Sequence, residues 1–559
     1  MNQPSDKINI IYDNNQTIQT IKGTTLNDIL ALIPQRNYAP VGAIVNNELQ
    51  ELDYPLYTDS TVTWVDISTS TGWLIYRRSL TFLLLLAVHE CFPDHHLWVS
   101  HSLAEGLFCW VEDEQKNRLS ATEIAVLEKK MNEYVAADMP IQRVTVAKED
   151  AVSFFKNEGK DNKASLLMRR TQQYLSLYKA HNFSDYLFGR MATHAGMLKD
   201  FRLIPFEDGF VLCLPCREYL GIRKTVELEP RKLQACLRDY QEWTSLLHIK
   251  TVSDLNAIVD QGRKDFSELV LICETLQERI LHNITDQIER HFPEVRLILM
   301  AGPSSSGKTT TAHRLCIQLR SVGIRPVMIS MDDYFLDIGV TPLNERGNPD
   351  YEGLGAMDLE LFHQNMDDLL AGKSASIPLY DFKNGKSIPG HRNIKLEDDQ
   401  ILIVEGIHAI NEVVSANIAK KNKRKIFISA LTQINLDENT PFFTSDNRLI
   451  RRIVRDASSR GLSPITTLNH WDEVRRGEHC NIFPYQEEVD FFVNSALLYE
   501  LPVLRPLIED QLAAIGPEEQ CYLEAKRILQ LIRYFSPADY DLVPRNSVLQ
   551  EFIGHSIFS

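Results

Sequence analysis

The hydrophobic and polar positions divide the chain into segments of different period. Residues 7–66 alternate short apolar and β-branched runs with turns, and one helical pattern, TLNDILALI at 25–33, interrupts them. Residues 228–290 place apolar side chains at helical spacing without any run of special chemistry. We therefore expect a small α+β roll over residues 1–67, a helical linker over residues 228–290, and a helical C-terminal tail over residues 508–559, with YLEAKRILQLIRYF as its helical run.

Length and composition indicate a soluble protein of several domains. The 559 residues exceed one ordinary core, and 44% hydrophobic with 24% charged residues is the balance of a globular protein. The longest apolar run, Leu80–Val88, is far shorter than the roughly 20 residues that a membrane span needs. The nine cysteines, an odd number, predict reduced thiols rather than a disulfide framework. We expect a cytoplasmic protein without a membrane segment.

The net charge bears on the class of partner. A formal net charge of -16 argues against broad electrostatic adhesion to nucleic acid, although a local basic groove is compatible with an acidic chain. One basic run, KKNKRK at 420–425, directly precedes the apolar run IFISA. We interpret this run as a solvated turn before a strand rather than as a nucleic-acid patch.

A glycine-containing loop lies between a predicted strand and a predicted helix. The strand VRLILMA runs directly into GPSSSGKTT, and helical periodicity follows. In such a loop the backbone N–H groups and the positive end of the helix cradle phosphate, and Lys308 adds charge. Thr309 offers a hydroxyl to Mg²⁺. The residues predicted to bind the phosphates of ATP are Gly302, Ser304, Ser305, Ser306, Gly307, Lys308, Thr309 and Thr310.

Carboxylates follow the next predicted strands. The run RPVMISMDDYF carries Asp332 and Asp333, about one strand-helix-strand unit after the loop. A carboxylate there can accept the proton of an attacking hydroxyl and can complete a magnesium shell, and a capping role in a turn is the alternative. The apolar strand QILIVEGIHAI carries Glu405, at the position of the acidic residue of a Walker B strand. We expect Glu405 to support Mg²⁺.

Four arginines share one face of a predicted helix. The segment DNRLIRRIVRDASSRG carries them at three- and four-residue steps, as Arg448, Arg451, Arg452 and Arg455. Like charges so placed repel, and a bound phosphate relieves that repulsion. The alternative is an ordinary solvated face, because Asp446 and Asp456 are near in sequence.

The order of these motifs resembles the uridine kinase and phosphoribulokinase family across residues 296–507. The matching stretches are GPSSSGKT, SMDDYF, IPLYDF, ILIVEGIHAI, RLIRRIVRDASSRG and NIFPYQE. The resemblance implies a doubly wound α/β P-loop kinase with a parallel sheet over residues 291–507. It implies Asp332 as catalytic base beside Lys308, with Thr309, Glu405 and Asp332 as ligands of Mg²⁺. It also implies a lid over the ATP phosphates, formed by Arg451, Arg452 and Arg455.

The acceptor side of this resemblance departs from the family pattern. DYEGLGAMD offers Tyr351 and Glu352 for the family's aromatic-acidic pair, with glutamate in place of the usual aspartate. Tyr380 and Phe382 of PLYDF match its base-contacting aromatics, which can stack on a base or simply fill a core. The histidine that usually follows is absent, and Gly385 falls near its position. The predicted substrate-binding residues are Asp332, Tyr351, Glu352, Tyr380, Phe382 and Arg448.

The front of the chain resembles parts of threonyl-tRNA synthetases. GTTL at 23–26 and the strands around it are similar to a TGS domain, a β-grasp module. GWLIYRRSLTFLLLLAVHECF and FSDYLFGRMATHAGMLKDF resemble the α+β editing domain, assigned to residues 68–227. The resemblance implies a retained fold with the editing chemistry lost, because the family's reactive positions are occupied by Arg78, Phe82, Leu187 and Met191.

The sequence supports one leading function and two alternatives. The leading hypothesis is a kinase that uses ATP and Mg²⁺ to phosphorylate the 5′-hydroxyl of a nucleoside, with uridine or cytidine preferred and a homo-oligomer left open. An RNA-binding or regulatory NTPase is disfavoured because the sequence lacks an N-K-x-D guanine motif and carries PLYDF. A surviving aminoacyl-tRNA deacylase is opposed by the replaced editing positions. We expect the front half to sense a ligand or to dimerise.

Overall fold

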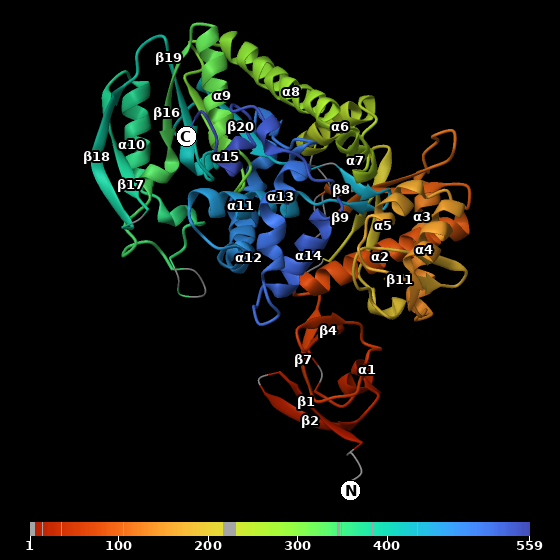
Figure 1. Cartoon of the computed structure of the whole chain (residues 1–559). Helices are drawn as coiled ribbons and strands as arrows, with labels where there is room; N and C mark the ends of the chain where they lie inside the picture. Colours follow the sequence, from red (N-terminus) through yellow and green to blue (C-terminus); the bar gives the residue numbers. More distant parts are fainter. Residues whose placement is uncertain are drawn as a thin grey trace.

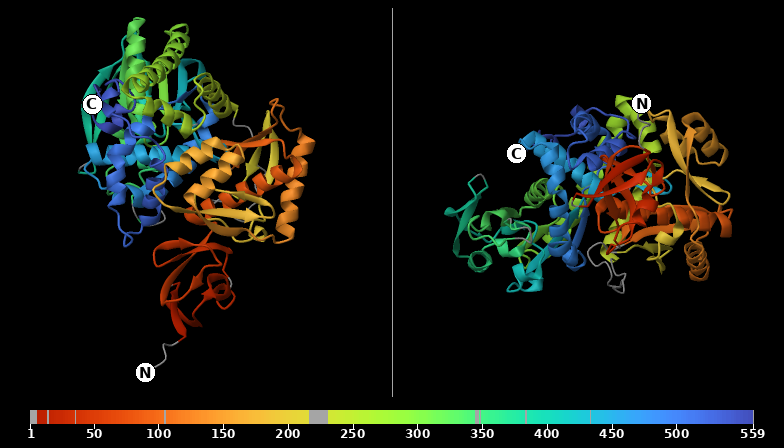
Figure 2. Two further views of the ribbon diagram at one scale, coloured as in Figure 1. Left: turned by 45° about the vertical axis from the view of Figure 1, so that its right-hand side comes forward. Right: turned by 90° about the horizontal axis from the view of Figure 1, so that it is seen from below.

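A small N-terminal domain protrudes from the larger body of the protein (Figures 1 and 2). The computed structural model describes residues 6–558 except 14, 35, 104–105, 216–230, 344–346, 348, 383 and 433. The predicted boundary between residues 227 and 228 lies outside the described residues.

The N-terminal domain is a five-stranded sheet against one short helix. The strand order is β2-β1-β7-β4-β5, and only β1 and β7 run parallel among its described pairs. Helix α1 begins after Thr25, whose hydroxyl accepts from the Asp28 N–H while the Asp28 carboxylate accepts from the Thr25 N–H. The arrangement is the β-grasp roll expected from the sequence. Its elements are β1 (Lys7–Tyr12), β2 (Gln16–Ile21), β3 (Thr24–Thr25), α1 (Leu26–Leu30), β4 (Pro40–Val45), β5 (Glu48–Gln50), β6 (Pro55–Leu56) and β7 (Ser60–Asp66).

An α+β domain follows, built around the long helix α2 (Ser70–Cys91). This helix is apolar and long enough to cross a membrane by length and composition, yet most of it is buried in a hydrophobic core that it shares with neighbouring helices and strands. The sheets have the orders β13-β14-β9-β8 and β10-β11-β12. The other elements are β8 (His96–Leu103), β9 (Gly106–Glu112), α3 (Ala121–Ala136), β10 (Gln142–Ala147), α4 (Lys148–Asn157), α5 (Asp161–Met168), β11 (Tyr174–Ala180), β12 (Phe183–Asp185), β13 (Arg202–Phe206) and β14 (Gly209–Cys213).

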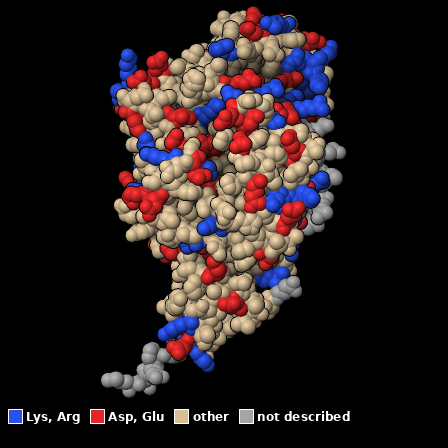
Figure 3. Space-filling view, turned by 90° about the vertical axis from the view of Figure 1, so that its right-hand side faces the viewer, with Lys and Arg blue, Asp and Glu red and all other residues tan. Residues whose placement is uncertain are grey.

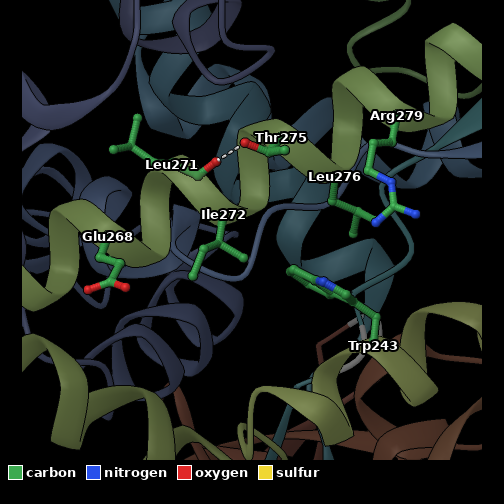
Figure 4. A pocket seen from close by; sticks show the side chains of 7 residues that line it. All are labelled: Trp243, Glu268, Leu271, Ile272, Thr275, Leu276 and Arg279. Atoms are coloured by element: carbon green, nitrogen blue, oxygen red, sulfur yellow. Dashed lines mark hydrogen bonds between the residues drawn. The ribbon is translucent and has the colours of Figure 1, made fainter.

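Three helices connect this domain to the C-terminal half, as the periodicity predicts. They are α6 (Arg231–Leu246), α7 (Val252–Gln261) and α8 (Arg263–Glu289). They do not form a free linker, because Val252 and Phe266 share one buried core with Leu449 and Phe535 from the far end of the chain. A surface hollow lies between α6 and α8 (Figure 4), where the Thr275 hydroxyl donates to a carbonyl of the same helix. Its lining is largely apolar, and we assign no chemistry to it.

The C-terminal half is built on a five-stranded parallel sheet, which confirms the predicted fold class. The order is β16-β19-β15-β20-β23, and each neighbouring pair is parallel. Because β15 lies at the centre, the loop that leaves it emerges at the middle of the carboxyl edge, where α/β sheets bind ligands. The elements are β15 (Leu297–Ala301), α9 (Lys308–Ser321), β16 (Arg325–Ser330), α10 (Leu359–Leu370), β17 (Ser374–Asp381), β18 (Lys386–Lys395), β19 (Gln400–Glu405), β20 (Lys423–Ser429), α11 (Thr444–Ser459), α12 (Pro464–Asn481) and β23 (Phe491–Asn494).

The basic run at 420–425 is not a solvated turn throughout. Lys423 and Lys425 belong to β20 and are buried. Both ammonium groups pair with the carboxylate of Glu412, and Lys423 also donates to the Ser415 hydroxyl at 2.9 Å. The prediction is wrong for these two lysines, because a carboxylate and oxygens of the preceding segment satisfy their charge inside the fold.

The C-terminal segment folds back onto the half of the chain that contains the parallel sheet. It comprises α13 (Glu500–Ala513), α14 (Tyr522–Ile532) and α15 (Gln550–Ile553), and α14 confirms the predicted tail helix. Helix α15 lies against α11 and near the start of α9 (Figure 1).

A polar seam joins the two halves of the chain at a hairpin of β21 (Asn435–Asp437) and β22 (Thr440–Pro441), directly before α11. The Asn435 and Asn439 amides donate to the carbonyl groups of Val99 and Leu97, at 2.7 and 2.8 Å. Lys163 of α5 lies between Asp185 and Asp437, and all three side chains are fully buried. The hairpin therefore connects the synthetase-like domain to the start of α11, the helix that carries the four arginines.

Candidate active site

The predicted phosphate loop connects β15 to α9. Ser305 and Gly307 have positive φ angles of 59° and 81°, a backbone course that turns successive N–H groups inward. The Lys308 ammonium donates to the carbonyl groups of Gly302 and Pro303, at 2.9 and 3.2 Å. The buried hydroxyls of Ser305 and Ser306 have no hydrogen-bond partner among the described residues. These unsatisfied donors fit a site that receives an anion.

Two predicted acidic residues lie at the carboxyl ends of the neighbouring strands. Glu405 ends β19 directly opposite Ser330, the last residue of β16. The Ser330 hydroxyl donates to Glu405 at 3.3 Å and accepts from the Asp332 N–H at 3.3 Å. One serine therefore links the backbone that carries Asp332 to the Glu405 carboxylate.

The electrostatics of the loop and the acids are coupled. Burial raises the pKa of Asp332 and raises the pKa of Glu405 to about 7, while the Lys308 ammonium opposes both shifts. Burial lowers the pKa of Lys308, and the Glu405 and Asp332 carboxylates oppose that change. One ammonium group therefore lies in the electrostatic environment of two carboxylates. When both carboxylates are ionised, the net charge of the three groups is negative, which favours the binding of a further cation.

The donor set suits Mg²⁺. Thr309, Asp332 and Glu405 offer only oxygen atoms, the ligand type that hard cations prefer. Within the described ranges, no group of three or more His, Cys, Asp or Glu side chains could hold a metal ion alone. Magnesium in phosphoryl-transfer sites is usually held by one or two carboxylates together with water and substrate phosphates. The residues present therefore fit a cation that binds together with a nucleotide.

Two of the four arginines on α11 support the loop from within the fold. Arg448 and Arg451 are 1% and 0% exposed, and Arg448 donates to Glu478 while Arg451 donates to Glu500. They also donate to the carbonyl groups of Ser304 at 3.1 Å and of Ser495 at 2.9 Å. The expectation that these side chains lie free for phosphate or acceptor differs from the structure, because buried carboxylates already neutralise them.

The other two arginines lie closer to the loop surface. Arg452 donates to the Ser304 hydroxyl at 2.8 Å. Arg455 pairs with Asp456 at 3.2 Å, and burial lowers the pKa of Arg455 to about 10. Both keep some exposure, at 18% and 13% of the side chain, so they remain candidates for phosphate contact.

The predicted acceptor-side aromatics come together around Phe335. Its ring centroid lies 5.7 Å from Tyr351, 5.5 Å from Tyr380 and 6.0 Å from Phe382. Tyr380 is buried, whereas Phe382 is 65% exposed. An exposed ring at the edge of an aromatic cluster offers a face for stacking, and Tyr380 serves as core packing.

Glu352 lies in the same electrostatic environment as the loop. Burial and the neighbouring Glu478 carboxylate raise the pKa of Glu352 to about 7, against the pull of Arg452 and Lys308. Its backbone carbonyl accepts from the Asn481 amide at 2.8 Å. Glu352 is therefore positioned by α12 and carries a proton over part of the neutral pH range.

The raised pKa of Glu352 gives a pH-dependent stability. The folded protein holds this proton up to about pH 7, whereas an unfolded chain releases it near pH 4, so wild-type stability falls across that interval. We expect Glu352→Gln to raise the melting temperature relative to wild type more at pH 8 than at pH 5, by a few degrees. Exposed Glu397→Gln is the control. Equal differences at the two pH values contradict the shift.

The four replaced editing positions lie at the centre of the synthetase-like domain. Phe82, Leu187 and Met191 are buried in one hydrophobic core. Arg78 donates to the Arg190 carbonyl, and a side chain at Gly189 would collide with its guanidinium. Apolar packing and a bound guanidinium therefore fill the region where the family resemblance places editing residues.

On the described part of the face in Figure 3, basic side chains are interspersed with acidic ones rather than gathered in a stripe.

Sequence reasoning missed the carboxylates that complete the loop. Glu478 accepts from the Ser304 N–H at 2.9 Å as well as from Arg448, which holds the pKa of Glu478 low although burial opposes this. Glu551 accepts from the Thr310 N–H at 3.1 Å. The repelling arginines of α11 are the only sequence signal that could have prompted a search for such partners.

A parallel sheet with this loop at its carboxyl edge defines the class of protein as a P-loop phosphotransferase. Residues 297–496 match the Phosphoribulokinase / Uridine kinase family. A uridine kinase of Ureaplasma parvum serovar 3 is 31% identical over 175 residues, covering 31% of this chain and 75% of that enzyme. The chain belongs to the phosphoribulokinase and uridine kinase family, whose members carry out ATP-dependent phosphoryl transfer.

The front part has different relatives. A threonine–tRNA ligase of Desulforamulus reducens is 27% identical over 167 residues, which are 30% of this chain and 26% of the ligase. The chain thus spans about a quarter of that relative.

Among solved structures, a possible uridine kinase from Bacillus stearothermophilus overlays with a TM-score of 0.22 and 26% sequence identity, covering 27% of this chain and 79% of that one. So low a TM-score adds nothing to the fold, which the parallel sheet itself defines.

Proposed function

We propose that the protein is a nucleoside kinase that transfers the γ-phosphoryl group of ATP to the 5′-hydroxyl of a uridine-like or cytidine-like nucleoside. The observation that carries the proposal is the placement of Asp332 within the electrostatic environment of Lys308 and Glu405, with an aromatic cluster beginning at Phe335. The similarity to the uridine kinase of Ureaplasma parvum serovar 3 supports the same substrate class.

The proposed reaction assigns a role to each group. The acceptor hydroxyl oxygen forms a bond to the γ-phosphorus, the bond from that phosphorus to the bridging oxygen breaks, and ADP leaves. Asp332 accepts the hydroxyl proton, and its raised pKa increases its affinity for that proton. Lys308 and the loop N–H groups offset the charge that develops on the phosphoryl oxygens.

Thr309, Asp332 and Glu405 are the residues that would hold Mg²⁺. Bound there, the cation supplies charge neutralisation for the phosphates. On the acceptor side, we assign the exposed ring of Phe382 to stacking on a base, and we assign Glu352 to a hydrogen bond with the nucleoside.

A direct assay tests the acceptor. ADP release from ATP and Mg²⁺ is followed across a panel of ribonucleosides, deoxyribonucleosides and sugars, and the product is identified by mass spectrometry. We expect one pyrimidine nucleoside to stimulate release well above background and to gain one phosphate at the 5′ position. Turnover of a sugar alone overturns the nucleoside assignment, and the absence of any phosphorylated product across the panel overturns it as well.

A further inference from the structure

The C-terminal segment lies across the start of the phosphate-loop helix. Val548 contacts Gly307 so closely that a Cβ atom built on this glycine would be 2.3 Å from a Val548 methyl group. Glu551 accepts from the Thr310 N–H at 3.1 Å. Phe558 stacks on His313 with ring centroids 5.3 Å apart and ring planes 4° apart. Positions 307, 310 and 313 recur at three-residue steps, so the segment follows one face of α9.

The Glu551 carboxylate accepts a hydrogen bond from a backbone N–H group that is suited to binding phosphate. Thr310 is the third residue of α9, and its N–H is one of the four at a helix start that have no partner within the helix. These groups, with the positive end of the helix dipole, attract anions. Glu551 also lies within the electrostatic environment of Lys308 and Arg455, where its charge raises the pKa of each against the opposing effect of burial.

The backbone around Glu551 is anchored elsewhere. Phe552 is buried beneath the Arg451 guanidinium, 5.0 Å from the ring centroid, and its carbonyl accepts from the Ser458 hydroxyl at 3.0 Å. Tyr499 and Ser547 lie within hydrogen-bond distance, with their hydroxyls 3.0 Å apart. Glu551 itself is only partly buried. Its side chain can therefore leave Thr310 without unfolding α15.

We propose that Glu551 is an internal competitor for the phosphates of the donor nucleotide, so that nucleotide binding requires its carboxylate to leave the Thr310 N–H. The segment lies beyond the matched family region, which ends at residue 496. The inference concerns the nucleotide site alone and does not depend on which acceptor the enzyme uses. It makes the last residues of the chain a determinant of nucleotide affinity.

Nucleotide affinity is the measurement that tests the competition. Glu551→Gln keeps the size and an acceptor oxygen but removes the charge that opposes phosphate. We expect this variant of the full chain to bind ADP with a Kd about three- to tenfold lower than wild type by isothermal titration calorimetry, the range set by a charge at a helix start. Exposed Glu518→Gln, with the same change of charge in the same part of the chain, is expected to stay within about twofold of wild type.

Three outcomes overturn the proposal. An unchanged Kd means that the carboxylate does not compete, and a higher Kd means that Glu551 supports the bound nucleotide. If ADP binds neither the wild type nor the variant, the proposed nucleotide site does not exist. Because ADP binding needs no acceptor, failure of the nucleoside assay leaves this test intact.

Discussion

Asp332→Asn is expected to lower kcat by roughly 10²–10⁴-fold, the range typical for loss of a general base. The asparagine keeps the shape of the side chain after β16 but cannot accept the acceptor proton. The measurement is steady-state ADP release with the best acceptor of the panel, together with ADP affinity by calorimetry. We expect ADP affinity measured without added Mg²⁺ to change far less than kcat, because we assign the hold on the phosphates to Lys308 and the loop N–H groups rather than to Asp332.

The adjacent residue supplies the matched control. Burial raises the pKa of Asp333 as well, but its carboxylate lies by the Tyr380 backbone and Arg392. Asp333→Asn should therefore retain activity within about tenfold of wild type, with any loss expressed chiefly in KM. If the two variants lose kcat equally, or if Asp332→Asn keeps more than a third of the wild-type value, Asp332 is not the base.

Lys163→Met is expected to destabilise the protein by about 3–5 kcal/mol, the range for removing one partner of a buried ion pair. Lys163 Nζ lies 2.5 Å from Asp185 and 3.7 Å from Asp437, and both carboxylates are fully buried. Burial raises the pKa of Asp437 even with the lysine present, so the loss of Lys163 leaves two carboxylates with insufficient compensation.

Thermal and urea unfolding of the whole chain measure this effect. A lower melting temperature is expected at pH 7, and the deficit should shrink at lower pH as the stranded carboxylates take up protons. Lys156→Ala is the control, because that lysine is exposed on α4 of the same domain. A melting temperature within about 1 °C of wild type for Lys163→Met contradicts an essential role for the buried ion pair.

The elements that carry phosphate chemistry could be predicted because their signals are local. GPSSSGKTT needs only the strand before it and the helix after it, and β15 and α9 occur as expected. Glu405 follows from an apolar strand with an acid at its end, and β19 ends at that residue. In each case a few neighbouring residues determine both the conformation and the chemistry.

The environment of the arginine helix could not be predicted in this way. The sequence places Arg448 and Arg451 on one face correctly, but their partners Glu478 and Glu500 are 30 and 49 residues further along the chain. No periodic pattern links residues so far apart. Without those partners a repelling cationic face looks free for phosphate, whereas the fold uses two of its members to hold the carbonyl groups beside the loop. The contact of Glu551 with Thr310, 241 residues away, could not be predicted for the same reason.

The seam at the β21–β22 hairpin has a practical consequence for fragments of this protein. A recombinant piece beginning near residue 291 would present Asn435, Asn439 and Asp437 to solvent in place of Val99, Leu97 and Lys163. It would also strip α6–α8 from a shared hydrophobic core, which exposes an apolar surface prone to aggregation. Low activity of such a fragment could result from the disrupted core and exposed hairpin just as well as from the loss of regulation by the synthetase-like half. Point substitutions in the intact chain are therefore the sounder way to learn what the synthetase-like half contributes.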